Sequence, residues 1–132
     1  MSVKALIVDD SPAARKLIGH QLRQLGCEIV GEAETAVDGL RLFDQLRPEL
    51  ITLDLMMPSR DGVDSMALVE TVKRSAPNVG IIVVSSIPFE KLRTDFLEKG
   101  VLDYVIKPFN DYTIQRLRVK LRRAFPQLIK IN

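Results

Sequence analysis

Carboxylates follow two short apolar runs of this sequence. Residues 5–8 lead directly into Asp9 and Asp10, and residues 50–53 lead into Asp54. A short apolar run bounded by polar and turn-forming residues is typical of a strand that is buried on both faces. Because the carboxyl ends of parallel strands lie at one edge of a sheet, we expect these acids to meet there, where open α/β sheets bind ligands.

A hydroxyl and an amine follow two further apolar runs. Ser85 comes directly after residues 81–84, and Lys107 comes directly after residues 104–106. Carboxylates held close together repel one another, so the acids need a cation beside them. Mg²⁺ accepts carboxylate oxygens and leaves positions for phosphate oxygens, and the Lys107 amine supplies a second positive charge. These residue types predict phosphoryl transfer, with Asp54 as the nucleophile that forms an acyl phosphate.

Several other chemistries lack the residues that they require. Cys27 is the only cysteine, which excludes an internal disulfide and a multi-cysteine metal site, and we expect a small, partly buried side chain there. His20 is the only histidine, so the chain can form neither a Ser-His-Asp nor a Cys-His arrangement, and we expect this imidazole on the surface. The sequence also lacks the glycine-rich phosphate loops of nucleotide-binding proteins.

The length and composition suit one globular domain. The chain has 132 residues, of which 46% are hydrophobic and 27% are charged, close to the average of folded domains. No apolar run approaches the roughly 18 residues of a membrane span, and the N-terminal apolar run is too short for a signal peptide. We therefore expect a cytoplasmic protein with no membrane partner. We place one domain at residues 1–125 and a tail, or the start of a linker, at residues 126–132.

Apolar periodicity predicts strands and helices that alternate along the chain. Continuous apolar runs indicate strands, and apolar residues at steps of three and four indicate helices. The expected strands are 5–8, 29–33, 50–53, 81–84 and 104–106, with 29–33 at an edge, and the expected helices are 12–25, 36–47, 63–75, 88–99 and 112–125. Because strict alternation implies right-handed crossovers, we predict a three-layer α/β fold, with helices on both faces of a doubly wound, five-stranded parallel sheet.

Four segments together resemble the receiver domain of bacterial two-component response regulators. They are the Asp9-Asp10 pair, DLMMPSRDG from Asp54, the Ser85-Ser86 pair, and YVIKPF from Tyr104. The resemblance covers essentially the whole chain, and the combination is specific although each segment alone is weak. It implies a flavodoxin-like (βα)5 fold with the strand order 2-1-3-4-5.

The resemblance implies a role for each acidic residue of the predicted site. Asp54 corresponds to the phosphoacceptor of the family, and Lys107 corresponds to its counter-ion. Asp10, with Asp9 partly through water, corresponds to the acid pair that binds Mg²⁺. Asp54 and the backbone carbonyl of Met56 complete the implied set of protein ligands to the metal.

The resemblance also implies that two residues change conformation on phosphorylation. Ser85 corresponds to the switch hydroxyl that moves toward the phosphoryl group, and Tyr104 corresponds to the aromatic side chain that turns inward with it. The bond between Lys107 and Pro108 is typically cis in this family. Ser86 departs from the family, because a small Ala or Gly is common at that position.

The implied function is that of a signalling switch rather than an enzyme. The phosphoryl donor would be a sensor histidine kinase or a phosphotransfer protein. The receiver itself would catalyse the transfer, and slow autodephosphorylation would follow. Output would pass through the last helices and strand to a downstream effector protein or an output domain, and a phosphorylation-dependent homodimer is left open.

Two other functions stay open when the residues are considered without the resemblance. A Mg²⁺-dependent phosphohydrolase would also use Asp54, but such enzymes favour a second acid two residues later, where this chain has Met56. A basic nucleic-acid-binding module would use the cations of the last predicted helix, which are Arg116, Arg118, Lys120, Arg122 and Arg123. Because no aromatic residues lie between these cations, we do not expect this domain to bind nucleic acid. Turnover on phosphate esters would identify the first alternative, and steep salt dependence of binding the second.

Overall fold

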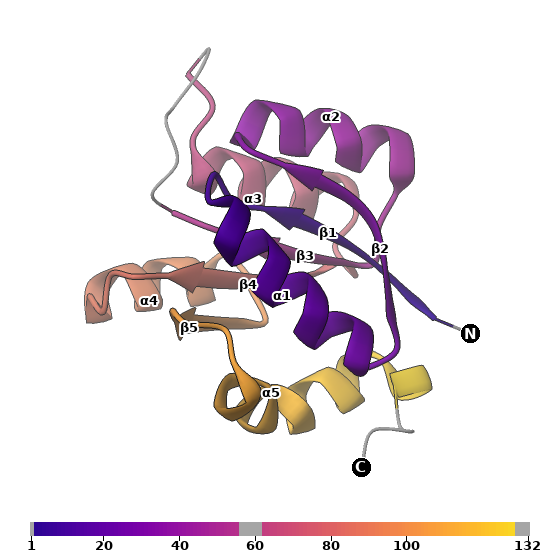
Figure 1. Cartoon of the computed structure of the whole chain (residues 1–132). Helices are drawn as coiled ribbons and strands as arrows, with labels where there is room; N and C mark the ends of the chain where they lie inside the picture. Colours follow the sequence, from indigo (N-terminus) through magenta and orange to yellow (C-terminus); the bar gives the residue numbers. More distant parts are fainter. Residues whose placement is uncertain (1, 56–61, 129–132) are drawn as a thin grey trace.

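The computed structural model of the chain describes residues 2–55 and 62–128. Within these residues, five parallel strands form one sheet in the order β2-β1-β3-β4-β5. The strands are β1 (Val3–Val8), β2 (Cys27–Ala33), β3 (Leu50–Leu53), β4 (Gly80–Ser85) and β5 (Asp103–Ile106). The helices are α1 (Pro12–Gln24), α2 (Ala36–Leu46), α3 (Ser65–Ser75), α4 (Glu90–Glu98) and α5 (Asp111–Ala124), followed by the short 3-10 helix η1 (Pro126–Leu128). The predicted alternation, the strand order and the edge position of β2 are confirmed (Figure 1).

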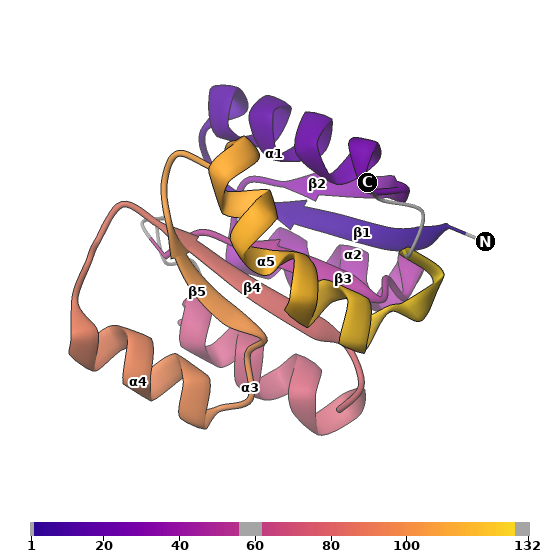
Figure 2. The same ribbon diagram turned by 90° about the horizontal axis from the view of Figure 1, so that it is seen from below.

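Helices cover both faces of the sheet. In Figures 1 and 2, α1 and α5 lie on one face, and α2, α3 and α4 lie on the other. Successive residues of β1 alternate between these two cores: Ala5 and Ile7 pack with residues of α1 and α5, whereas Leu6 and Val8 pack with residues of α2 and α3. Because both faces are buried, the strands read as continuous apolar runs in the sequence.

The ends of α1 follow the predicted local signals. The Ser11 hydroxyl accepts a hydrogen bond from the Ala14 amide at 3.2 Å, and Pro12 occupies the first turn. At the other end, Gly26 has a φ angle of 98°, a conformation that favours glycine after a helix. These signals fix where the chain leaves β1 and enters the helix beside the predicted site.

Four predicted boundaries were wrong by two residues. β1 begins at Val3 instead of residue 5. β2 begins at Cys27 instead of residue 29, because Cys27 already pairs with Val3 of β1. α3 begins at Ser65 instead of residue 63, because the Asp64 carboxylate caps it by accepting a hydrogen bond from the Ala67 amide at 2.8 Å. α4 begins at Glu90 instead of residue 88. Here the Ile87 amide donates to the Ser85 hydroxyl at 3.0 Å and holds the chain in a loop.

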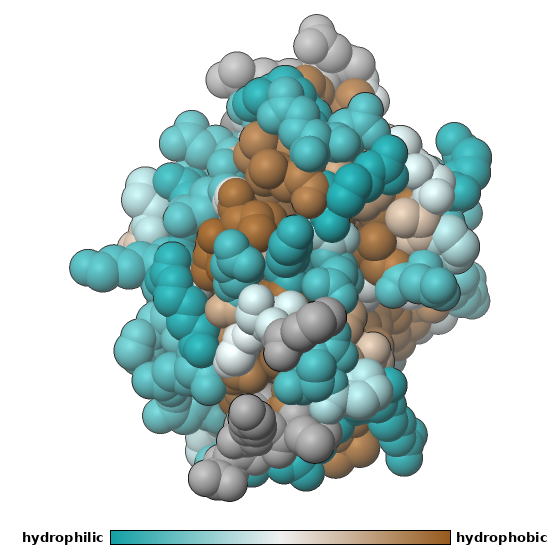
Figure 3. Space-filling view, turned by 90° about the vertical axis from the view of Figure 1, so that its right-hand side faces the viewer, coloured by the Kyte–Doolittle hydropathy of each residue, from teal (hydrophilic) through white to brown (hydrophobic). Residues whose placement is uncertain are grey.

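The amino ends of the strands are closed by apolar side chains that follow α5. Phe125 and Leu128 are 5% and 2% exposed and belong to the core beneath α1 and α5. Gly80, at the start of β4, leaves room for Phe125, because a Cβ atom there would lie 3.1 Å from its ring. Figure 3 faces this end of the molecule and shows hydrophobic side chains between hydrophilic ones. Across the described residues, every helix falls short of the length and apolarity that a membrane span requires.

Candidate functional site

Two buried carboxylates stand one residue beyond their strands. The Asp9 amide, just after β1, donates to the Ala33 carbonyl of β2 at 2.9 Å, and the Asp54 amide, just after β3, donates to the Val8 carbonyl of β1 at 2.9 Å. These bonds continue the parallel ladders and bring both acids to the same edge of the sheet. Asp9 is 1% exposed and Asp54 is 2% exposed, so two carboxyl groups are withdrawn from water at this edge.

Asp10 adds an exposed carboxylate to this pair. One carboxylate oxygen from each of Asp9, Asp10 and Asp54 lies within 4.8 Å of the others. A set of oxygen donors without His or Cys suits a hard divalent cation, and Mg²⁺ in particular, because this ion keeps positions for water or phosphate oxygens. The residues therefore fit the metal that the sequence predicts. Met56, whose carbonyl was expected to be a further ligand, lies outside the described residues.

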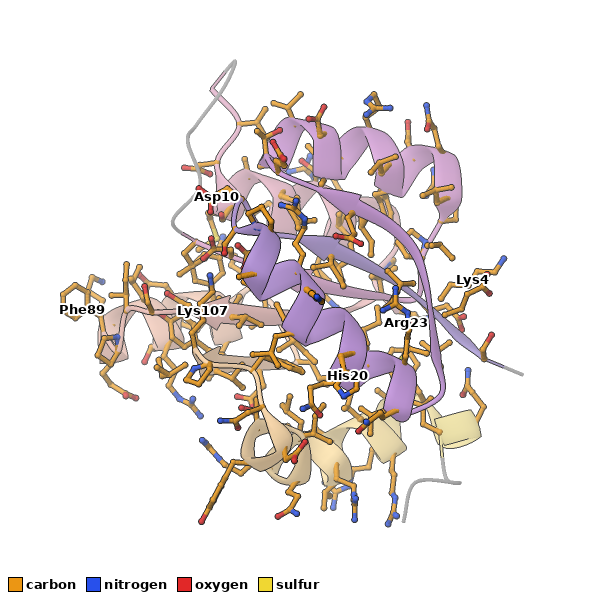
Figure 4. All side chains as sticks on the ribbon, in the orientation of Figure 1. Lys4, Asp10, His20, Arg23, Phe89 and Lys107 are labelled. Atoms are coloured by element: carbon orange, nitrogen blue, oxygen red, sulfur yellow. The ribbon has the colours of Figure 1, made fainter. Side chains whose placement is uncertain are left out.

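Lys107 brings a fixed cation to the carboxylates. Its amine lies 3.0 Å from Oδ2 of Asp9 and 3.6 Å from Oδ1 of Asp54. The Lys107 amide donates to the Ser85 carbonyl at 2.8 Å, which ties the end of β5 to the end of β4. Figure 4 shows Lys107 and Asp10 at the same end of the sheet and Lys4 at the opposite end. The bond between Lys107 and Pro108 is cis, as the resemblance led us to expect.

Ser85 and Tyr104 meet at the backbone of Ile87. Ser85 is fully buried at the end of β4, and its hydroxyl accepts a hydrogen bond from the Ile87 amide at 3.0 Å. Tyr104 is 3% exposed, and its hydroxyl donates to the Ile87 carbonyl at 2.5 Å. Both polar groups of Ile87 are thus bound by the two residues that were expected to move, although no sequence signal pointed to Ile87.

Two other polar residues at the site were missed by the sequence analysis. The buried Ser65, at the start of α3, donates its hydroxyl to the Asp54 carbonyl at 2.9 Å. Arg15, on α1, donates Nη1 to the Asp9 carbonyl at 2.6 Å. Arg15 lies on the helix, whereas its partners Asp9 and Glu32 follow or belong to two different strands, and no local sequence signal joins them.

The lone histidine lies on the surface, as expected, and the lone cysteine is buried more deeply than expected. Cys27 is buried at the start of β2, and its burial, together with the nearby Glu49 carboxylate, raises the pKa of the thiol to about 11. A thiol with a raised pKa is protonated at neutral pH and is a poor nucleophile. His20 is exposed on α1 and shares a hydrogen bond of 3.0 Å with the Gln24 side chain.

Comparison with known proteins agrees with this arrangement. Residues 5–119 match the family described as response regulator receiver domain. The chain is similar to the chemotaxis protein CheY of Listeria monocytogenes, with 31% identity over 107 residues that cover 81% of this chain and 87% of that protein. It is also similar to the solved REC domain of AraT, a response regulator from Geobacillus stearothermophilus, with 27% identity, a TM-score of 0.79 and coverage of 98% of both chains. The CheX-CheY-BeF3-Mg complex from Borrelia burgdorferi shares the fold, with 22% identity, a TM-score of 0.81 and coverage of 93% of this chain and 89% of that chain.

Fold and sequence agree on the class of protein, which is a signalling domain of the two-component type. The chain belongs to the response regulator receiver domain family. Receiver domains act together with histidine kinases and with effector or output domains. Of the three functions that the residues left open, the receiver domain is the one that the family match supports.

Proposed function

We propose that Asp54 of this receiver domain accepts a phosphoryl group from a phosphohistidine donor, in a reaction that depends on Mg²⁺. The observation that carries the proposal is the position of the Lys107 amine, 3.0 Å from the Asp9 carboxylate and 3.6 Å from the Asp54 carboxylate. A buried carboxylate lies there beside a cation and beside two further acids that suit a metal. This charge pattern stabilises a phosphoryl group in transfer, because positioning and charge neutralisation do most of the catalytic work.

The chemical step uses an Asp54 carboxylate oxygen as the nucleophile. It attacks phosphorus, the P–N bond of the phosphohistidine breaks, and the electron pair of that bond returns to the imidazole of the donor. The Lys107 amine, 25% exposed, offsets negative charge on the phosphoryl oxygens. Asp9, Asp10 and Asp54 would hold Mg²⁺, which supplies further charge neutralisation when it is bound. Attack of water on the acyl phosphate then returns Asp54 and releases inorganic phosphate, which is the slow autodephosphorylation.

The conformational change that follows phosphorylation passes from Ser85 to Tyr104 through the backbone of Ile87. A phosphoryl group on Asp54 adds negatively charged oxygens, to which the Ser85 hydroxyl can donate a hydrogen bond. As Ser85 moves toward them, its hydrogen bond with the Ile87 amide, 3.0 Å long, is remodelled. Tyr104 holds the Ile87 carbonyl at 2.5 Å, so the displacement reaches β5 and the start of α4.

A downstream effector or an output domain binds the surface formed by α4, β5 and α5. Large apolar side chains of the described residues are exposed on these elements or directly before them: Phe89 (63%), Ile106 (42%), Tyr112 (78%) and Val119 (59%). A groove of about 280 Å³ joins this apolar surface to the side chains of Arg93 and Arg116. Because the groove is lined by both Phe89 and Tyr104, the switch residues border the surface that the partner contacts.

Acetyl phosphate with Mg²⁺ tests the phosphoacceptor directly. We expect mass spectrometry to place one phosphoryl group on Asp54, and we expect no labelling of Asp54→Asn or of the wild type in EDTA. The matched control is Asp44→Asn, which removes an exposed carboxylate that pairs with Arg47 at the C-terminal end of α2 and should leave labelling unchanged. Phosphate on another residue, or full labelling of Asp54→Asn, would contradict the proposal.

The same protein with beryllofluoride and Mg²⁺ tests the switch. We expect the largest changes in amide chemical shift at Ile87, Phe89 and Ile106, in addition to those at the acids. Changes confined to the neighbourhood of Asp54 would show that the signal does not reach the surface of α4, β5 and α5.

A further inference from the structure

Arg15 contacts the acid cluster without being one of its members. Its Nη1 donates to the Asp9 carbonyl at 2.6 Å, and its Nε donates to Glu32 Oε1 of β2 at 3.0 Å. Its Nη2 lies 3.7 Å from Glu34 Oε1. The side chain is only 13% exposed, so this cation is held in one place between α1, β2 and the end of β1.

The contact with Arg15 completes a set of bonds around Asp9. The Asp9 amide donates to Ala33, its Oδ1 accepts from the Ser11 amide at 2.9 Å, and its Oδ2 lies 3.0 Å from the Lys107 amine. The carbonyl that Arg15 binds belongs to the peptide joining Asp9 to Asp10. This peptide sets the direction in which the exposed Asp10 leaves the strand.

We propose that Arg15 is a positioning residue for Mg²⁺ binding, anchored by Glu32, and that it holds the peptide between Asp9 and Asp10 so that both carboxylates face Asp54. The inference rests on the proposed function, because it assigns Arg15 a role toward the metal that Asp9, Asp10 and Asp54 would hold. A guanidinium suits the task because its planar donors can bind a carbonyl and a carboxylate at once.

If Arg15 positions the metal ligands, its loss should weaken Mg²⁺ binding. Electrostatics alone predicts that its loss should strengthen Mg²⁺ binding. Arg15 is a cation near a site that binds a cation, so its charge alone opposes Mg²⁺ binding. Removal of the guanidinium would also leave Glu32 and Glu34 without their ion pairs and would make this region more negative. A change to alanine should therefore strengthen Mg²⁺ binding if Arg15 acts through charge, and should weaken it if Arg15 acts by positioning.

Calorimetric titration of metal-free protein with MgCl2 separates these two effects. We expect Arg15→Ala to bind Mg²⁺ about tenfold or more weakly than the wild type, which is the usual effect of losing a residue that orients metal ligands. We also expect Arg15→Lys to bind about tenfold more weakly, because one ammonium group cannot bridge Asp9 and Glu32. Glu32→Gln keeps an acceptor for Arg15, so its affinity for Mg²⁺ should fall less than that of Arg15→Ala.

Arg41→Ala is the matched control. Arg41 is an exposed arginine of α2 that lies 3.7 Å from Asp38, so its loss should not change Mg²⁺ affinity. Urea unfolding of each variant in EDTA shows whether the fold is intact before the metal is added, and Arg15→Lys and Glu32→Gln keep the test decisive if Arg15→Ala does not fold.

Unchanged or tighter Mg²⁺ binding by Arg15→Ala, or full affinity of Arg15→Lys, would overturn the proposal. Failure of the proposed function would look different. In that case the wild-type protein itself would show no Mg²⁺ binding, and the proposed role of Arg15 would fall with it.

Discussion

The two ends of the sheet differ in the side chains that gather there. At the carboxyl ends, β1, β3, β4 and β5 lead into Asp9, Asp54, Ser85 and Lys107, and the two acids are withdrawn from water. At the amino ends, the spaces between strands and helices are filled by hydrocarbon, with Phe125 and Leu128 packed beneath the sheet. The carboxyl end of the sheet therefore gathers charged side chains, and the amino end is packed with apolar side chains.

This difference separates the source of stability from the source of chemistry. Burial of a Phe or Leu side chain stabilises a fold by roughly 1.5–3 kcal/mol, whereas a buried carboxylate is unfavourable unless it is paired. Lys107 pairs with Asp9 and Asp54, yet Asp9, Asp10 and Asp54 still repel one another in the absence of a metal. We infer that substitutions at the amino end of the sheet change stability with little effect on phosphorylation. Substitutions at the carboxyl end should change phosphorylation with little effect on stability.

The largest expected effect is at the amino end. Phe125→Ala should lower the free energy of unfolding by about 3–5 kcal/mol, because it removes a nearly buried ring and leaves a cavity above Gly80. Urea unfolding measures the loss. Labelling by acetyl phosphate, normalised to the folded fraction, should stay at the wild-type level. A large loss of labelling in the folded fraction would show that the two ends are not independent.

Mg²⁺ should stabilise the protein only through the carboxyl end. At a concentration of 100 times its dissociation constant, the ion should raise the free energy of unfolding of the wild type by about 2.7 kcal/mol. Phe125→Ala should keep this increment, because its three acids are unchanged, whereas Asp54→Asn should lose most of it. Urea unfolding with and without Mg²⁺ measures each increment. An equal increment in Asp54→Asn would contradict the assignment of Asp54 to the metal site.

The fold could be predicted because its main signals are local. Each strand reads as a continuous apolar run, each helix shows a buried stripe, and alternation of the two permits little besides a parallel sheet. The meeting of Asp9, Asp54 and Lys107 follows from the same reasoning, since each of them directly follows a strand.

The remaining parts of the site depend on contacts between distant segments. The bond from Ser65 to the Asp54 carbonyl requires the exact approach of α3 to β3, and the bond from Tyr104 to Ile87 joins β5 to a loop. Periodicity places such residues on a helix or a strand but does not say which carbonyl a hydroxyl reaches. Arg15 was missed for the same reason, because its partners Asp9 and Glu32 lie on two different strand segments.

The smallest of these effects is a pH dependence of the free energy of unfolding that arises at the amino end of the sheet. Cys27 is buried at the start of β2, and its burial, with the nearby Glu49 carboxylate, raises the pKa of the thiol from 9.0 to about 11. Because the folded-state pKa is the higher one, the stability linked to this proton is fully present below pH 9 and is lost as pH rises toward 11. The loss should reach about 2 kcal/mol by pH 11, since one pKa unit corresponds to about 1.4 kcal/mol.

Cys27→Ala isolates this contribution, because the other groups that titrate in alkali are common to both proteins. With a reducing agent present, the difference in unfolding free energy between wild type and Cys27→Ala should shift in favour of the variant between pH 9 and pH 11. Asp54→Asn should show the same alkaline loss as the wild type, because the thiol is at the opposite end of β1 and β2 from the acids. A parallel pH dependence of wild type and Cys27→Ala would mean that the thiol ionises as readily in the folded protein as in the unfolded chain. The amino end would then be more accessible to water than the burial of Cys27, Phe125 and Leu128 implies.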